Sequence, residues 1–289
     1  MKALNKIAIG VLVLIVLASV FAPLITKYDP VKIDLDNIKI SPNSKHLFGT
    51  DNKGRDIFSR VLYGGRFSIS IAFIAAIFSL SIGLAIGLLS GYYGKKIDMV
   101  IMMFVDLVLS FPSLLLAIGI SVIFPAGIFT VVIAITAVGW ASFARLVRGH
   151  VLSLKEQPFI EAARSIGCSD IRIILVHLLP NCLPLSFVFL GLKLGGYLLT
   201  ESALSFLGLG VQPPMPTWGS IISLNRIYIS SAPWTIVFAG LAIVLTVMCF
   251  NIIGDALRDR LDYASSGFYS INSKIKYQKS KLWKKRFLS

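Results

Sequence analysis

Six apolar stretches of about 20 residues dominate this sequence. Because a helix rises about 1.5 Å per residue, a stretch of that length crosses a hydrocarbon core about 30 Å thick. Of the 289 residues, 56% are hydrophobic and 15% are charged, whereas soluble domains are typically about 45–50% apolar and about 25% charged. The sequence therefore predicts an all-α membrane protein with six transmembrane helices. The expected spans are, in chain order, 7–25, 68–90, 99–124, 128–145, 184–207 and 234–253.

These spans divide the chain into three expected regions. Residues 1–66 form an amino-terminal anchor helix and an outer loop, 67–262 form the transmembrane core, and 263–289 form a basic cytoplasmic tail. The core contains a cytoplasmic loop at 150–181. The first apolar run is longer than the about 7–15 residues of a signal peptide, and no clear cleavage site follows it. We therefore expect this segment to be retained as an anchor.

Lysine and arginine residues predict the orientation. With the amino terminus inside, the cytoplasmic segments carry 18 of them and the outer segments carry 9. This bias favours cytoplasmic amino and carboxyl termini. The first outer loop, residues 27–66, nevertheless holds 8 of the 9 outer basic residues. We interpret the net charge of +14 as contact with anionic lipid rather than with nucleic acid.

Small residues recur closely in the second span, at Ser79, Ser81, Gly83, Ala85 and Gly87. Small side chains let membrane helices approach one another tightly. The cysteines and histidines are too few and too scattered to predict a disulfide framework or a metal site. They are Cys168, Cys182, Cys249, His46, His150 and His177.

The loop between the fourth and fifth spans has the pattern of a helix-turn-helix. Pro158 favours a helix start, Gly167 supplies a break, and Ser169 or Asp170 is suited to cap a second helix. Apolar residues then recur at helical spacing, and Pro180 is expected to end this helix. An amphipathic helix pair of this kind either lies in the membrane interface or docks a partner. The residues alone leave both readings open.

This loop resembles the EAA loop of ABC importer permeases. The pattern is Glu-Ala-Ala, three residues, Gly, and nine residues to a hydrophobic-Leu-Pro ending; the matching residues are Glu161, Ala162, Ala163, Gly167, Leu179 and Pro180. The resemblance implies a coupling helix that seats on an ATP-hydrolysing subunit. For Glu161, capping its own helix is an alternative to a bond with that partner. The expected docking residues are Glu161, Ala162, Ala163, Arg164, Gly167, Ser169, Asp170, His177 and Pro180.

The resemblance extends over roughly residues 5–262 and is to the second, C-type permease of the dipeptide, oligopeptide and nickel branch. Its motifs include Phe48-Gly49-Thr50-Asp51, Gly54-Arg55-Asp56 with Arg60, Asp106 with Phe111-Pro112, Ser205-Phe206-Leu207-Gly208-Leu209-Gly210, Pro213-Pro214, Trp218-Gly219, and Asn251 with Gly254-Asp255 and Leu257-Arg258-Asp259.

This likeness implies the type I permease fold and a place in the inner membrane of a bacterium. The implied partners are a second homologous permease, two ATP-binding subunits and an extracellular solute-binding lipoprotein or periplasmic protein. ATP and magnesium are then bound by the ATPase subunits, and no cofactor is bound directly by this chain. The implied cargo is a di- or oligopeptide. Nickel or a metal–chelator complex is the alternative, because the same scaffold serves both.

Three charged residues fall inside the predicted spans rather than at their ends: Asp106, Lys193 and Glu201. Such groups usually face a bundle interior. They either line the translocation path, where the ends of a peptide need partners, or pair with the second permease. Lys193 and Glu201 are eight residues apart, which separates them by about 12 Å along a helix and prevents a direct pair.

Two other functional classes fit less well. A secondary transporter driven by an ion gradient usually shows internal repeats and broken midplane helices in both halves, and no convincing repeat is present. A membrane enzyme needs converging catalytic groups, and the sequence holds no Ser/His/Asp set, HExxH motif or carboxylate pair. No GxxxxGK[ST] motif occurs either. We therefore expect a transport subunit that is not an enzyme.

Overall fold

The structure is a computed structural model that describes the backbone of residues 2–287 and the side chains of residues 3–260. Within this part the regular secondary structure is helical, apart from one isolated bridge between Thr50 and Asp56. The helices are α1 (Lys2–Val20), α2 (Ala22–Ile25), η1 (Leu35–Asn37), α3 (Ile57–Tyr93), α4 (Lys95–Ser110), α5 (Ser113–Ile123), α6 (Ile128–Lys155), α7 (Pro158–Ser165), α8 (Asp170–Arg172), the π-helical turn η2 (Ile173–Leu178), α9 (Leu179–Phe206), α10 (Trp218–Asn225), η3 (Arg226–Tyr228) and α11 (Trp234–Phe287).

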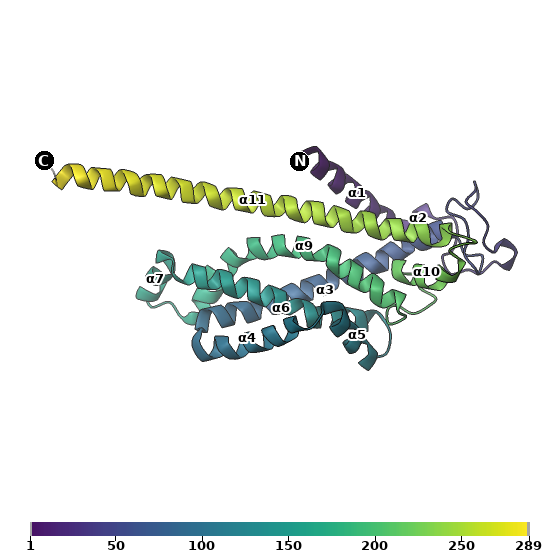
Figure 1. Cartoon of the computed structure of the whole chain (residues 1–289), viewed down its shortest axis with the longest axis horizontal. Coiled ribbons are helices and arrows are strands. Elements are labelled where there is room, and N and C mark those ends of the chain that lie inside the picture. The colour runs from purple at the N-terminus through teal and green to yellow at the C-terminus, as the bar shows by residue number, and fades with distance from the viewer. Residues whose placement is uncertain (1, 288–289) are drawn as a thin grey trace.

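The helices form an elongated bundle with two distinct ends (Figure 1). One end, here the α7 end, carries α7, α8 and the turn between α3 and α4. The other, here the α10 end, carries α2, α10 and the loop that precedes α3. Segments predicted to be cytoplasmic, the α3–α4 turn and the loop after α6, therefore lie at the α7 end, and the predicted outer loop lies at the α10 end. Which membrane face each end occupies stays a prediction.

The predicted spans correspond to five long apolar helices and one bent helix pair. The pair is α4 and α5, which meet at 93° where the third span was expected to be one helix. Pro112 causes the break, since proline lacks an amide hydrogen and disfavours helical geometry in the residue before it. Phe111 accordingly is extended, with φ −89° and ψ 143°.

Several helices are longer than predicted. α3 begins at Ile57, before the expected start at residue 68, and α6 continues to Lys155, beyond the expected end at residue 145. Polar first and last turns carry little hydropathy signal, so the apolar pattern marks only the part of a helix that lies in hydrocarbon. The 37 residues of α3 span about 55 Å, well beyond the about 30 Å core.

Glycines on α3 bring it into close contact with α6, with which it runs parallel. A Cβ placed on Gly83 would lie 2.3 Å from Cβ of Phe143, and one on Gly87 would lie 2.7 Å from Cβ of Val147. The predicted tight approach is confirmed for these two positions. Ser81 and Ala85 are exposed and do not take part in it.

The prediction that Pro180 ends the second loop helix is wrong. The helix runs from Asp170 through η2 into α9, which contains both Pro180 and Pro184. In η2 the amide of Leu179 bonds to the carbonyl of Ile174, five residues back. A π-helical turn widens the helix, which accommodates the missing amide hydrogen and the ring of Pro180 in a continuous helix.

A buried ionic cluster organises the α10 end. Asp51 is fully buried and its Oδ2 lies 2.7 Å from Nη2 of Arg55 and 3.7 Å from Nε of Arg60. Arg60 also donates to the carbonyl of Pro30 at 2.8 Å. Asp56 caps α3 by accepting from the amide of Ser59 at 2.7 Å. Two of the basic residues that made the outer loop unusual are therefore buried inside the protein, where they share the carboxylate of Asp51.

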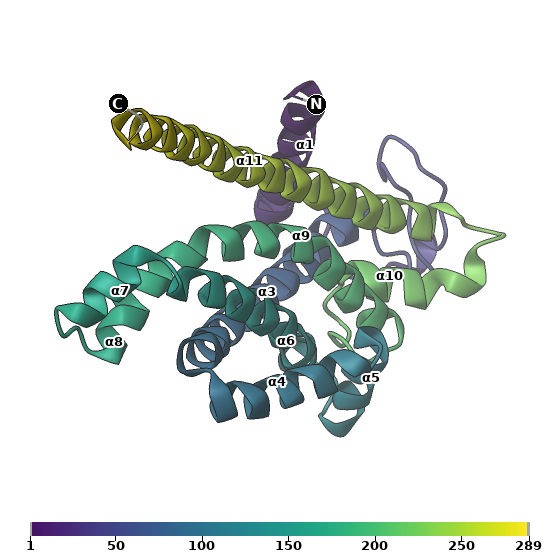
Figure 2. The same ribbon diagram turned by 60° about the vertical axis from the view of Figure 1, so that its left-hand side comes forward.

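Helix α10 is inserted beside the first turns of α3. Trp218 is buried, and its indole Nε1 donates to the carbonyl of Val61 at 2.8 Å. α11 leaves this end and runs along α9 (Figure 2). Gly254 lies on Leu192 of α9, where an added Cβ would come within 2.7 Å. The predicted basic tail, 263–289, continues α11 as far as Phe287, and its side chains lie outside the described residues.

Candidate functional site

The loop at the α7 end is a helix-turn-helix, as predicted. α7 begins at Pro158 and ends at Ser165, and Gly167 follows with φ +80°, a backbone conformation that favours glycine. α8 begins at Asp170, with Ser169 at the N-cap. The proline therefore starts the first helix and the glycine permits the turn into the second.

One side of this loop is anchored in the bundle. Ile160 and Ala163 of α7 are buried in a cluster with Leu88, Val147 and Val151 of α3 and α6. Because Ala163 has a small side chain, α7 lies close to these helices. The predicted docking residue Ala163 thus belongs to the inner side of the loop.

The other side of the loop is exposed and unexpectedly apolar. Ile166 is 80% exposed, Ile171 is 68% exposed and Phe159 is 41% exposed. Exposed large apolar side chains at a polar end of a membrane protein indicate an interaction surface. We name this the α7–α8 surface, and its exposed members are Phe159, Glu161, Ala162, Arg164, Ile166, Gly167, Ser169 and Ile171.

The remaining predicted docking residues lie beside this surface. His177 is half-buried in η2, with its ring 6.5 Å from that of Phe159. Pro180 is exposed on the first turn of α9. Glu161 is exposed in the first turn of α7, where a carboxylate also interacts favourably with the helix dipole. The structure therefore brings the nine predicted residues together at one end of the molecule.

A polar network ties the loop to the transmembrane helices. Tyr92 Oη, at the end of α3, donates to Oδ1 of Asp170 at 2.5 Å. The guanidinium of Arg164 lies 5.6 Å from the centroid of the Tyr92 ring. Lys155 Nζ donates to the carbonyl of Tyr92 at 2.6 Å. Three separate segments, α3, the end of α6 and the loop, thus meet at Tyr92.

A second link joins α4 to α6. Arg148 Nε donates to Oδ1 of Asp98 at 3.0 Å, and Arg148 Nη2 bonds to the other carboxylate oxygen. Ser90 Oγ also donates to Asp98, at 2.6 Å. Sequence reasoning used Arg148 and Lys155 only as positive charges and missed their roles. The one available signal was that basic residues and Asp98 cluster at the ends of neighbouring spans.

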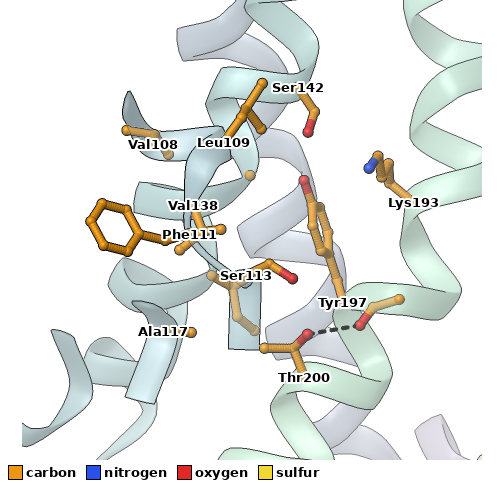
Figure 3. A pocket seen from close by; sticks show the side chains of 13 residues that line it. Val108, Leu109, Phe111, Ser113, Ala117, Val138, Ser142, Lys193, Tyr197 and Thr200 are labelled. Atoms are coloured by element: carbon orange, nitrogen blue, oxygen red, sulfur yellow. Dashed lines mark hydrogen bonds between the residues drawn. The ribbon is translucent and has the colours of Figure 1, made fainter. Parts of the chain in front are cut away.

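A cavity of about 160 Å³ lies beside the α4–α5 break (Figure 3). Its lining combines residues from both sides of the break with residues of α6 and α9. Lys193, Tyr197 and Thr200 project into this region from α9. The lining residues are Val108, Leu109, Phe111, Ser113, Ala117, Ile135, Val138, Gly139, Ser142, Lys193, Gly196, Tyr197 and Thr200.

Of the three ionisable residues predicted for the translocation path, only Lys193 lines this cavity. Asp106 is exposed and forms an ion pair with Arg145 of α6. Glu201 is fully buried and accepts a hydrogen bond from Ser205 Oγ at 2.8 Å. The structure thus places Lys193 and Glu201 in different surroundings, although both lie on α9.

Comparison with known proteins assigns the chain to a family. The sequence profile of the binding-protein-dependent transport system inner membrane component matches residues 83–264. The N-terminal transmembrane domain of oligopeptide transport permease C matches residues 4–43.

Two relatives are similar over most of their length. The dipeptide transport system permease protein DppC of Alkalihalophilus pseudofirmus is 46% identical, with 89% of this chain and 86% of the relative covered. The glutathione transport system permease protein GsiD of Pectobacterium atrosepticum is 42% identical, with the same 89% and 86% covered. Such permeases are transport subunits and are not enzymes themselves.

The fold is shared with a solved structure. An inward-facing conformation of the MetNI methionine ABC transporter superposes with a TM-score of 0.55 at 20% identity, covering 69% of this chain and 95% of that chain. The predicted ABC importer permease fold is therefore confirmed. The multi-pass helices agree with an inner-membrane protein. The chain belongs to the family of binding-protein-dependent transport system inner membrane components and resembles the C-type permeases of peptide importers.

Proposed function

We propose that this chain forms half of the translocation path of an ABC importer for di- and oligopeptides, and that its α7–α8 surface docks on an ATPase subunit. The observation that carries this proposal is the apolar exposure of Ile166 and Ile171 on a loop anchored to α3 and α6. An exposed surface on rigid helices is suited to receive a partner. Tyr92 and Asp170 connect this surface to the membrane helices.

The remaining parts of the importer follow from this role. A second homologous permease completes the path, two ATPase subunits bind ATP and magnesium, and an extracellular binding protein delivers the solute. The α7 end is then cytoplasmic, and so are the two termini. The α10 end, with its ordered loop before α3, is the outer end.

Peptide is the proposed cargo for two reasons. The similar permeases carry names that specify dipeptide and glutathione transport. Lys193 also places a positive charge beside the cavity, which repels a free divalent cation such as nickel. This charge favours a solute with a carboxylate over a metal ion.

Co-purification of the tagged chain from its native membrane tests the docking proposal. Ala162 is exposed, so Ala162→Arg places a bulky charge on the α7–α8 surface without disturbing the core. We expect the wild type to retain a second permease and an ATPase subunit, and Ala162→Arg to lose the ATPase subunit. Ala126→Arg, in an exposed position between α5 and α6, is the matched control and keeps it.

Two results contradict the proposal. Retention of the ATPase subunit and of ATP-driven uptake by Ala162→Arg would show that this surface is not the docking site. Transport by the isolated chain in liposomes on an ion gradient, without ATP, would replace the importer with a secondary transporter.

A further inference from the structure

The cavity beside the α4–α5 break lies where regular helix is interrupted within a predicted span. Val108 and Leu109 line it from the end of α4, and Ser113 and Ala117 line it from α5. Irregular backbone at membrane depth is tolerated where it is buried in protein or lines a water-filled cavity. The bend of 93° is of this kind, because residues on both sides of it line the cavity.

Lys193 is the cation of this pocket. It lies near the middle of α9 and is half-buried, with its Nζ 5.1 Å from the ring centroid of Phe189. Among residues 3–260, no carboxylate lies within ion-pair distance of Lys193. The two acidic residues within the predicted spans have partners of their own. Asp106 pairs with Arg145, and Glu201 accepts a hydrogen bond from Ser205.

The groups around Lys193 suit a carboxylate. Hydroxyls of Ser113 and Ser142 line the cavity, and none of the lining residues is acidic. The Thr200 hydroxyl also lines it but donates to the carbonyl of Gly196 at 3.0 Å. α5 starts at the cavity, and no side chain caps its first turn, so its amide dipoles add positive potential to that of Lys193. Hydroxyl donors and an ammonium group are the partners that a carboxylate binds most strongly.

We propose that this cavity is a transient binding site for the free α-carboxylate of a short peptide, with Lys193 as the charged partner. The inference rests on the proposed peptide transport and adds which part of the solute this permease recognises. An unpaired cation at this depth is costly for the bundle alone. The α-carboxylate of a transported peptide supplies the negative charge that pairs with Lys193.

Uptake by the complete transporter in native membrane vesicles tests this inference. The probes are alanyl-alanine and its carboxyl-terminal amide, which lacks the negative charge. We expect Lys193→Met to lower uptake of the free acid about tenfold, which corresponds to about 1.4 kcal/mol, and to lower uptake of the amide less than about twofold. Lys193→Arg retains the preference for the free acid. Lys96→Met, at an exposed position in the first turn of α4, is the matched control and changes neither.

A chemical cross-link provides a measurement that does not depend on transport of the amide. A carbodiimide joins a carboxylate to an amine in contact with it as an amide, and the elements of the water lost are taken up by the carbodiimide, which leaves as a urea. We expect labelled alanyl-alanine to be attached to Lys193 in the wild-type complex, detected by mass spectrometry of the digested chain, and the amide to give no product.

The outcomes separate the two proposals. Wild-type complex that takes up no peptide defeats the proposed function, and the inference falls with it. If the wild type takes up peptide but Lys193→Met lowers the uptake of both probes equally, or of neither, the inference is wrong and the proposed function stands. A carbodiimide cross-link from Lys193 to the second permease in place of the peptide also overturns it, since Lys193 then serves assembly.

Discussion

Tyr92 and Asp170 are 78 residues apart in the sequence, yet the Tyr92 hydroxyl donates to Oδ1 of Asp170 at 2.5 Å. Tyr92 lies in the last turn of the long transmembrane helix α3, and Asp170 begins the helix that leads into α9. Displacement of the α7–α8 surface therefore acts directly on α3. In the proposed importer, this contact is where closure of the ATPase subunits reaches the membrane helices.

Tyr92→Phe removes only this hydrogen bond and leaves the ring beneath Arg164 in place. One such bond is worth about 1 kcal/mol, so we expect uptake per ATP hydrolysed to fall about fivefold. The ATPase subunit still co-purifies, because the α7–α8 surface is intact. Tyr93→Phe is the control, since the Tyr93 side chain is exposed. Equal coupling in wild type and Tyr92→Phe would show that the contact does not transmit movement.

Gly83→Ala should disrupt the packing of α3 on α6. The added Cβ would lie 2.3 Å from Cβ of Phe143 and 2.6 Å from the carbonyl oxygen of Trp140, so the backbone of α3 or of α6 has to move. Overpacking of this kind costs about 1–3 kcal/mol, and we expect a lower melting temperature in detergent. Gly119→Ala in α5 has nothing within 4 Å of the new Cβ and should be neutral or slightly stabilising. A Gly83→Ala protein as stable as wild type would contradict the close approach.

Asp51→Asn tests the buried cluster at the α10 end. The change keeps the shape of the side chain but leaves Arg55 and Arg60 buried without their negative partner. Breaking a buried ion pair in this way costs about 3–5 kcal/mol, and thermal unfolding of the purified complex measures it. Asp36→Asn, at an exposed position in the same loop, should unfold at the wild-type temperature. Matching stability for the two variants would mean that the cluster does not hold this loop.

Glu201→Gln separates the two polar residues of α9. Glu201 is fully buried among Ser202 and Ser205 and does not line the cavity. The glutamine oxygen can accept from Ser205, and its amide NH2 can donate to the Ser202 hydroxyl in the reverse direction, so we expect a stability change within about 1 kcal/mol. The uptake ratio of alanyl-alanine to its amide should equal that of wild type. A changed ratio would place Glu201 in the path and contradict its assignment as a packing residue.

The sequence determined which stretches are long and apolar enough to cross a membrane and which loop forms a helix-turn-helix. Apolar stretches of span length follow from the hydrocarbon thickness, so the spans were predictable from composition along the chain. The helix-turn-helix was also predictable, because Pro158 and Gly167 act on their own backbone. Local steric rules of this kind need no knowledge of the rest of the fold.

The tertiary structure decided what these elements do together. The Pro180 prediction failed because the helix absorbs this proline in a π turn, and no local rule distinguishes that outcome from a helix end. Tyr92, Asp98 and Arg148 have partners far away in the chain, and their residue types do not specify which groups they meet. Lys193 and Glu201 lie on the same helix, and the packing around α9 decided that Lys193 lines the cavity and that Glu201 is fully buried. Charge and hydropathy are properties of a residue, but contact is a property of pairs, and only the folded arrangement of helices fixes the pairs.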